Sequence, residues 1–474
     1  MLFNTIAVTL LGMIAIPLII GTSLKAPKLM ALALMGVLFW FSSSSWGQLQ
    51  VENTIYSRGV GQLSFSLINI VLFVAGSAVL IRKLTDRQYP PLAPQFAPYF
   101  AGFAVLLLAH VAVAIVSGIE VLDALAYTGI INILNMLVFT YLAIMAFREE
   151  QGRDRLLLAI IALAGARAVF GVIRYVWFGG DSANPYGNFE RMDIKILFFD
   201  IADNFVASLA AFCAAWLLTA PELRLTFLKR LALYGFLALE IAAITLSFRR
   251  AALVGLALMF AFLLFRVSGR KRIQLALIAG AVLATGLTVF FQQRLQYVPR
   301  GDNILLSLFY DLLQNRPGSA QPQGRFYELW AAAQSIGDNW LFGLGTWGRF
   351  EDSRNLLDYQ FGRYDFVHSG FGHIVLKTGL LGLALFLGLL YRFVRFYFRH
   401  CNTLSGNARL FADAGFAGFL FWLPTLLIGT PIIEFRTMLL IGLTLALPFI
   451  AVGPARPPAV PDLANSPARR HAAA

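Results

Sequence analysis

The chain has 474 residues, of which 58% are hydrophobic and only 13% are charged. A soluble domain usually carries about 25% charged residues, so this composition excludes an ordinary soluble protein, a disordered chain and a small disulfide-bonded scaffold. The net charge of +13 would point to nucleic acid in a soluble protein. In a membrane protein the position of each basic residue is more informative than the total, and we expect no nucleic-acid partner.

Long apolar segments recur along the chain and predict an all-α, polytopic integral membrane protein. A run of about 20 apolar residues is long enough to cross a bilayer as a helix. The first run lacks a basic start and a small-residue cleavage site, so we expect a permanent helix there rather than a removed signal peptide. About thirteen candidate spans follow: residues 2–20, 28–45, 61–81, 98–118, 122–147, 156–178, 197–219, 227–247, 251–266, 273–292, 369–391, 411–429 and 433–452.

The basic residues predict how these spans are oriented. More than half of the 38 Lys and Arg residues lie in alternate connections and in the C-terminal tail. Because loops rich in Lys and Arg stay on the cytoplasmic side, this orientation places the N-terminus outside and the C-terminus inside. If one short span is re-entrant, the number of spans is twelve and the N-terminus lies inside as well.

Four regions follow from this arrangement. Residues 1–292 form a transmembrane bundle of about ten spans, and residues 368–452 form the C-terminal spans. Residues 293–367 between them form one large loop on the outer side, where 303–314 and 325–337 show the apolar spacing of amphipathic helices. The Pro- and Ala-rich tail, 453–474, is predicted to be disordered in the cytoplasm.

Several common types of site are excluded by the motifs. Cys213 lies in an apolar span and Cys401 in a basic loop, so we expect no disulfide between them. The sequence Gly343-Leu-Gly345-Thr-Trp-Gly348 fits G-x-G-x-x-G but lacks a preceding strand, which favours a Gly-rich turn over a dinucleotide site. No phosphate-binding loop or metal-ligand pattern is present, so we expect neither a metal nor a cofactor.

Three arginines depart from the charge pattern because they lie on the predicted outer side. Arg249 and Arg250 sit at a very short connection between two spans, where they could bind an anion or only contact lipid headgroups. Arg325 begins a predicted loop helix. It could form an anion site there, or only an ion pair with Glu328 three residues later.

Two histidines flank the predicted outer entrance of the span that begins at residue 369. His368 could act as a general base at the membrane–water boundary, although a structural role is the alternative. His373 follows five residues later, about 140° around a helix, so the two do not share a face and a paired metal site is not expected.

These residues resemble the O-antigen ligase and O-antigen polymerase superfamily. His368-Ser369 followed after nine residues by Gly379-Leu-Leu-Gly382 is similar to the pattern H-[NSQ]-x9-G-x-x-G of that family. Gly324-Arg325 with Trp330, then Gly343-x-Gly345, resembles its loop segment. Ser247-Phe248-Arg249-Arg250 resembles its short arginine motif, with an inserted Phe and two arginines, so both arginines remain candidates. The three motifs occur in the family's order within about residues 240–390.

The resemblance implies a GT-C-like glycosyltransferase whose active site faces the periplasm from the bacterial inner membrane. Such enzymes transfer a glycan from undecaprenyl pyrophosphate to an acceptor hydroxyl without metal or nucleotide. The acceptor is lipid A-core for a ligase and another glycan for a polymerase, and the motifs leave this open. The implied catalytic residues are His368 as base, with Arg325 and Arg250, while Arg249 and His373 would bind pyrophosphate or glycan.

Polar residues inside neighbouring spans leave two interpretations open. Arg174, together with Arg167, and the pair Asp200 and Asp203 could line a donor or acceptor cavity, or they could form ion pairs that hold helices together. At the level of the whole protein, a flippase or transporter of lipid-linked oligosaccharides is the alternative function. A scaffold that binds other polysaccharide-assembly proteins is a third.

Overall fold

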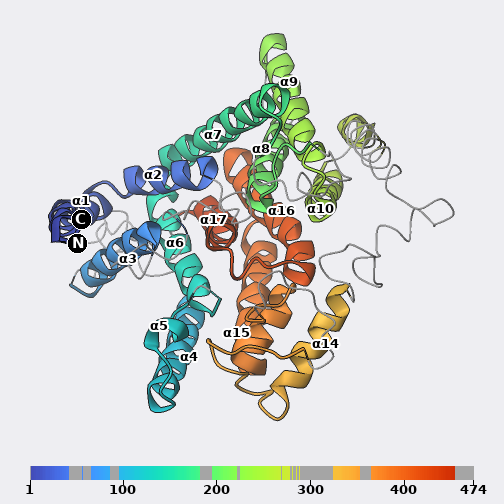
Figure 1. Cartoon of the computed structure of the whole chain (residues 1–474). Helices are drawn as coiled ribbons and strands as arrows, with labels where there is room; N and C mark the ends of the chain where they lie inside the picture. The colour runs from blue at the N-terminus through green and yellow to red at the C-terminus, as the bar shows by residue number, and fades with distance from the viewer. Residues whose placement is uncertain are drawn as a thin grey trace, which may run out of the picture.

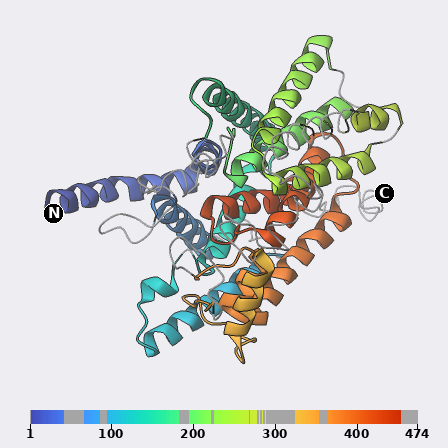
Figure 2. The same ribbon diagram turned by 45° about the vertical axis from the view of Figure 1, so that its right-hand side comes forward.

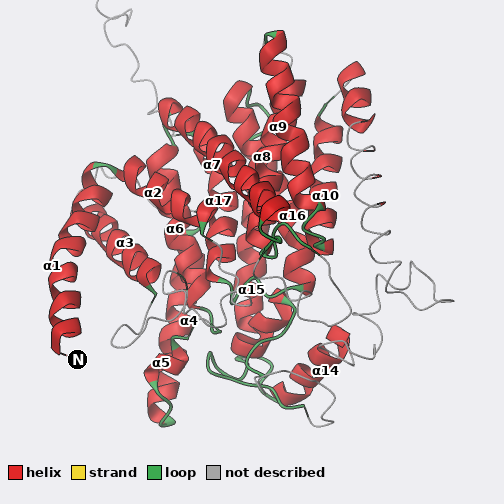
Figure 3. Cartoon of the chain, turned by 45° about the horizontal axis from the view of Figure 1, so that its top comes forward, coloured by secondary structure: helices red, strands yellow, loops and turns green. Residues whose placement is uncertain are grey.

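The computed structural model describes residues 2–41, 66–85, 95–126, 128–181, 195–220, 225–267, 269–277, 324–352 and 364–453, with isolated positions 56, 280, 284 and 288. Every regular element within these ranges is helical, which confirms the all-α prediction (Figures 1 and 3). The helices are α1 (Leu2–Lys25), α2 (Pro27–Trp40), α3 (Leu67–Thr85), α4 (Ala97–Val116), α5 (Val121–Ala124), α6 (Ile131–Phe147), α7 (Glu150–Trp177), α8 (Ile201–Thr219), α9 (Phe227–Thr245), α10 (Arg250–Arg266), α14 (Gly324–Ile336), α15 (Gly370–His400), α16 (Gly406–Ile428) and α17 (Phe435–Val452).

Twelve of the thirteen expected spans coincide with a helix, while 273–292 lies largely outside the described residues. Six described helices are long and apolar enough to cross a membrane by themselves, namely α4, α7, α8, α15, α16 and α17. The bent pair α1–α2 raises this number to seven when it is counted as one span. The chain is therefore a multi-pass membrane protein, and the total of twelve or thirteen spans stays a prediction.

The bend between α1 and α2 has a local cause. The chain bends by 117° between the two helices, and α2 begins with Pro27. Proline disfavours the helical conformation of the preceding residue, and Ala26 accordingly takes φ −137° and ψ 58°. A bent pair of this kind is either one broken span or a re-entrant element, so both alternatives for the N-terminus stay open.

The centre of the bundle is formed by α8 and α17, which are the most buried of the six membrane-crossing helices (Figure 2). Small residues allow their neighbours to approach closely. A Cβ atom at Gly442 of α17 would lie 2.8 Å from the backbone oxygen of Met136 in α6, and Thr140 donates to the Gly442 carbonyl at 3.0 Å. Close backbone packing and hydroxyl-to-carbonyl bonds are typical of helix contacts in membranes.

A buried carboxylate joins four helices at the end of the bundle where the sequence predicts the cytoplasm. Asp413 of α16 accepts hydrogen bonds from Tyr397 of α15 at 2.6 Å, from Arg266 of α10 at 3.2 Å and from Trp216 of α8 at 3.3 Å. Arg409, one turn earlier on α16, adds an ion pair at 3.0 Å. This network fixes the end opposite to the family motifs.

Candidate active site

His368 lies immediately before α15 and is held by α14. Ser369 caps α15, with its hydroxyl accepting the Gly372 N–H at 3.1 Å, so the helix begins next to the histidine. Glu328 of α14 is fully buried, and its carboxylate accepts the His368 backbone N–H at 3.1 Å. The same carboxylate lies 3.0 and 3.1 Å from the ring atom Nδ1. From the sequence, Glu328 was expected only as an ion-pair partner of Arg325, and its contact with His368 was missed.

Arg325 connects the start of α14 to the end of α16. Its guanidinium donates to the carbonyl of Ile428, the last residue of α16. Carbonyls at a helix C-terminus carry partial negative charge and have no partner within the helix, which makes them good acceptors for arginine. Arg325 and Glu328 therefore tie α14 to two different elements, α16 and the start of α15.

The arginine motif forms the turn between α9 and α10. Phe248 at its centre has φ 53°, the one positive φ of a non-glycine among the described residues. This turn lets the Ser247 hydroxyl accept the Phe198 N–H at 3.2 Å and lets Arg249 Nε donate to the Phe199 carbonyl. The inserted Phe248 therefore directs both neighbours toward the segment before α8, while Arg250 becomes the first residue of α10.

Arg249 is the more constrained of the two motif arginines. Its guanidinium carbon lies 3.9 Å from the centre of the Phe199 ring, and Nε is bound to the Phe199 carbonyl. Its two terminal nitrogens have no hydrogen-bond partner in the part of the chain that the structure describes. Stacking and a fixed Nε pre-orient these donors, as in sites that bind phosphate in a bidentate manner.

The three motifs meet at the connection between α16 and α17, residues 429–434. Arg325 donates a hydrogen bond to the carbonyl of Ile428, the residue just before this connection. A Cβ atom at Gly370, two residues after His368, would lie 3.1 Å from the Leu426 carbonyl and 3.3 Å from Pro431. Glu434, at the other end of the connection, interacts electrostatically with Arg249. Residues distant in sequence thus gather at one end of the helix bundle.

Glu434 is an acidic residue of this site that the sequence analysis missed. It accepts hydrogen bonds from Thr430 at 3.1 Å and from Thr437 at 2.7 Å. Burial, reinforced by the negative charge of Asp200, raises the pKa of Glu434 to about 7. In the sequence it lies at the start of the expected span 433–452, which was read only for its hydropathy.

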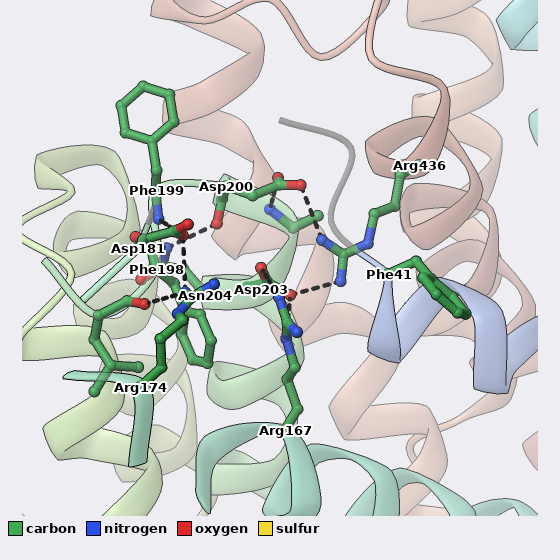
Figure 4. A network of polar contacts seen from close by, with 12 residues as sticks. Phe41, Arg167, Arg174, Asp181, Phe198, Phe199, Asp200, Asp203, Asn204 and Arg436 are labelled. Atoms are coloured by element: carbon green, nitrogen blue, oxygen red, sulfur yellow. Dashed lines mark hydrogen bonds and ion pairs between the residues drawn. The ribbon is translucent and has the colours of Figure 1, made fainter. Parts of the chain in front are cut away.

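Asp200 and Asp203 both contact a buried arginine, Arg436 of α17 (Figure 4). The fully buried guanidinium of Arg436 donates to Asp200 at 2.9 Å, to Asp203 at 2.6 Å and to the Leu38 carbonyl at 2.6 Å. Arg167 of α7 pairs with Asp203 from the other side at 3.0 Å. These contacts join α2, α7, α8 and α17, which favours the helix-holding interpretation of the two acids. Arg436 was missed because it lies within a segment read only for its hydropathy.

Arg174 belongs to a separate pair that supports the segment under Arg249. It donates to the Leu197 carbonyl at 2.7 Å and forms an ion pair with Asp181 at 3.0 Å (Figure 4). Asp181 in turn accepts the Phe199 N–H at 2.8 Å. The backbone of Leu197 and Phe199 is therefore fixed from one side by this pair and from the other by the arginine motif.

His373 contacts a different part of the molecule from His368. It is buried in α15, and its Nε2 lies 2.7 Å from the Thr128 carbonyl, just before α6. His368 precedes α15 and contacts α14 instead. The structure therefore does not bring the two histidines to one group of contacts.

The glycine motifs form a joint between the outer loop and α15. Gly379 takes φ 63° and ψ −162°, which breaks the helix. The chain after α14 fills the break, because Leu344 N–H bonds the Leu376 carbonyl and Leu380 N–H bonds the Trp340 carbonyl, both at 2.8 Å. A Cβ atom at Gly343 would lie 2.6 Å from the Gly379 nitrogen. The G-x-G-x-x-G sequence is thus a Gly-rich turn after a helix.

A family comparison supports this assembly of motifs. A model of the O-antigen ligase family matches residues 233–387, from the middle of α9 to the middle of α15. Residues 233–387 are therefore similar to O-antigen ligases. The match confirms the resemblance to O-antigen ligases and polymerases, and it contains the arginine motif, α14 and His368. No curated protein matches the chain. An O-antigen ligase region indicates a glycosyltransferase-type enzyme with a lipid-linked glycan and an acceptor as substrates.

Proposed function

We propose that the protein transfers a glycan from undecaprenyl pyrophosphate to a sugar hydroxyl, at the periplasmic face of the bacterial inner membrane. The O-antigen ligase region supports the reaction class. The observation that carries the mechanism is the contact of His368 Nδ1 with the buried carboxylate of Glu328. The proposed transfer uses no metal and no nucleotide, and it inverts the anomeric centre because it is a single displacement.

His368 is the proposed general base. When Nδ1 carries its proton and donates to Glu328, the lone pair of the ring lies on Nε2. As the acceptor oxygen attacks the anomeric carbon, Nε2 takes the hydroxyl proton and the positive charge that forms on the ring is stabilised by Glu328. A buried acid that orients a histidine in this way serves the same purpose in hydrolases with a Ser-His-Asp triad.

The arginines are the proposed site for the leaving group. When the sugar–oxygen bond breaks, its electron pair stays on the lipid pyrophosphate, whose negative charge increases. Guanidinium groups stabilise such oxygens by charge-assisted hydrogen bonds. Arg249 offers pre-oriented terminal nitrogens, while Arg250 and Arg325 lie at the starts of α10 and α14. We assign all three to pyrophosphate binding.

The remaining predicted site residues act through the scaffold in this proposal. Asp200 and Asp203 hold α8 to α17 through Arg436, and Arg174 fixes the segment that carries Phe199. His373 holds α15 against the start of α6. The four residues then keep the reacting groups in position, and α14 of the outer loop contacts the site through Arg325 and Glu328.

Transfer by the purified protein tests this function directly. The protein is reconstituted in liposomes with a lipid-linked glycan and an acceptor but no nucleotide, and the glycosylated acceptor is quantified. We expect transfer by the wild type and none by His368→Ala or Arg325→Ala variants of unchanged fold. Movement of the lipid-linked glycan across the bilayer without bond transfer would instead identify a flippase.

The acceptor decides between ligase and polymerase, and a deletion strain distinguishes them. Loss of a ligase leaves long glycan chains that are not attached to lipid A-core. Loss of a polymerase leaves single repeat units on the acceptor. Normal glycans in the deletion strain would contradict both assignments.

A further inference from the structure

The chain between α14 and Phe350 presents an apolar tip that the proposed chemistry does not use. Trp340, Leu341 and Phe342 are consecutive, and their side chains are 43, 56 and 57% exposed. An exposed run of three large apolar residues at a turn is unfavourable in water. The residues around the tip are polar and exposed: Asp338 and Asn339 before it, and Arg349 and Glu351 after it.

Backbone hydrogen bonds fix the level of this tip along α15. Leu380 N–H donates to the Trp340 carbonyl at 2.8 Å, and Leu381 N–H donates to the Leu341 carbonyl at 3.2 Å. Leu380 and Leu381 are themselves exposed. They begin an exposed apolar stripe that continues at helical spacing through Leu387 to Tyr391, on a helix long and apolar enough to span the membrane. The tip therefore continues a surface that faces lipid.

The length of α15 places the tip near one membrane boundary. Tyr397 marks the other boundary, because its hydroxyl bonds Asp413 where Arg266 and Arg409 converge. Leu380 lies seventeen residues before Tyr397, which corresponds to about 25 Å of helix. The hydrocarbon core is about 30 Å thick, and tryptophan concentrates at its boundaries with water.

Several backbone groups of the tip have the partners within the protein that non-helical chain at this depth requires. Groups there need partners within the protein, since lipid offers none. Gly343 N–H bonds the Asn339 carbonyl at 2.7 Å, and Leu344 N–H bonds the Leu376 carbonyl exposed by the break in α15. The Leu380 and Leu381 N–H groups on the other side of the break are satisfied by the tip itself.

We propose that Trp340, Leu341 and Phe342 are inserted among the lipid acyl chains, beside Leu380, in the leaflet on the side of His368. This tip anchors α14 to the membrane. The loop that carries Glu328 then follows the bilayer surface together with α15 rather than standing in water above it. The inference concerns the bilayer itself and does not depend on the reaction that the site performs.

Spin labels on single cysteines test the insertion. Cysteines replace Trp340, Leu341 or Phe342, with Asp338→Cys and Glu351→Cys as water-exposed controls and Leu380→Cys as the lipid-exposed control. Both native cysteines are buried, so the parent protein gives the background. In liposomes, we expect labels at 340–342 to be several-fold more accessible to oxygen, which concentrates in lipid, than to a water-soluble nickel chelate. We expect the opposite order at 338 and 351.

Two results would overturn the proposal. Labels at 340–342 that match the chelate accessibility of position 338 would show that the tip lies in water. Labels that neither reagent reaches would show that protein covers it. A second measurement needs no cysteine: the fluorescence lost in Trp340→Phe should be quenched by lipids brominated on their acyl chains. Quenching of this component by aqueous iodide instead would also contradict insertion.

Discussion

Glu328 holds both the backbone and the ring of His368. Its carboxylate accepts the His368 N–H at 3.1 Å and lies 3.0 Å from Nδ1, while its side chain, which projects from α14, is fully buried. A carboxylate removed from water and bound twice to one residue fixes that residue's position and its tautomer together. If His368 is the base, Glu328 is the residue that orients it.

The first prediction separates the base from its orienting acid. His368→Ala should lower the rate of transfer by about 10²–10⁴-fold, the usual contribution of a general base. Glu328→Ala should lower it less, and Glu328→Gln least, because the amide oxygen still accepts a hydrogen bond from Nδ1. The measurement is kcat for the liposome reaction. In the His368→Ala background, Glu328→Gln should have no further effect. Additive losses would mean that Glu328 acts independently of the histidine.

Arg249 and Arg250 can be distinguished by substitution. Arg249→Ala removes the pre-oriented donors and should lower kcat by about 10²-fold, as expected for loss of a charge-stabilising hydrogen-bond donor. Arg249→Lys keeps the charge but loses the fork that stacks on Phe199, and it should be intermediate. Exposed Arg270, four residues beyond the far end of α10, is the control, since its replacement by Ala should leave transfer unchanged. Full activity of Arg249→Ala beside an inactive Arg250→Ala would assign the role to Arg250.

Gly379 should be intolerant of any side chain. Its φ of 63° disfavours other residues by about 1–2 kcal/mol. An added Cβ would also lie 2.4 Å from the Leu341 carbonyl. Gly379→Ala should therefore lower the thermal unfolding midpoint and release the joint with the outer loop. Gly235→Ala in α9 is the matched control, because open space surrounds that glycine and alanine favours helix by about 1 kcal/mol. Equal midpoints for the two variants would contradict a tight joint at Gly379.

The Arg436 network should contribute strongly to stability. Arg436→Met leaves Asp200 and Asp203 buried with fewer partners, and the free energy of unfolding should fall by about 3–5 kcal/mol. Adding Asp200→Asn neutralises a carboxylate whose ion pair with Arg436 is lost, and it should restore part of the loss. Lys28→Ala breaks the exposed pair with Glu149 and should cost about 0–1 kcal/mol. If Arg436→Met lowers the free energy of unfolding no more than Lys28→Ala does, the network does not stabilise the fold.

Glu434 should make stability depend on pH. Burial raises its pKa to about 7, above the ordinary value of 4.5, so between these pH values the folded protein binds a proton that the unfolded chain has released. The free energy of unfolding therefore falls as pH rises from about 4.5 to 7 and is level above that range. Glu434→Gln should remove this fall, measured as unfolding midpoints at successive pH values.

Glu149 supplies the opposite control for that experiment. Its hydrogen bond to Lys28, together with the lysine's charge, lowers the pKa of Glu149. Its contribution to stability is present at neutral pH and is lost as pH falls through the lowered value. Glu149→Gln should therefore change the profile only on the acid side. The same profile for both variants would contradict the assignment to Glu434.

The sequence was sufficient for the membrane fold because hydropathy is a local property. Twelve expected spans coincide with helices, and the family match contains all three motifs. The break at Gly379 was not foreseen, since a glycine inside an apolar run gives no sign of the loop that fills the gap. The bend at Pro27 was not foreseen either, although its cause is local.

The partners of the site residues were beyond the sequence. Glu328 and His368 are 40 residues apart in the sequence, and Asp203 and Arg436 are 233 residues apart. Periodicity places each on a helix but does not state which helices pack. Arg436 and Glu434 also lie at the edge of a span read only as apolar, so their charges were overlooked. The roles assigned to all site residues stay predictions until transfer is measured.

The joint between Gly343 and Gly379 sets a rule for engineering the protein. The two glycines belong to different motifs. A Cβ atom at Gly343 would meet the backbone of Gly379, and one at Gly379 would meet the backbone of Leu341 and Trp340. A chimaera that imports the outer loop of a relative and ends it at His368 would pair a foreign turn with the native break. Its second crossover should lie beyond Gly382. The turn at Gly343 and the break at Gly379 then come from the same parent protein and still fit each other.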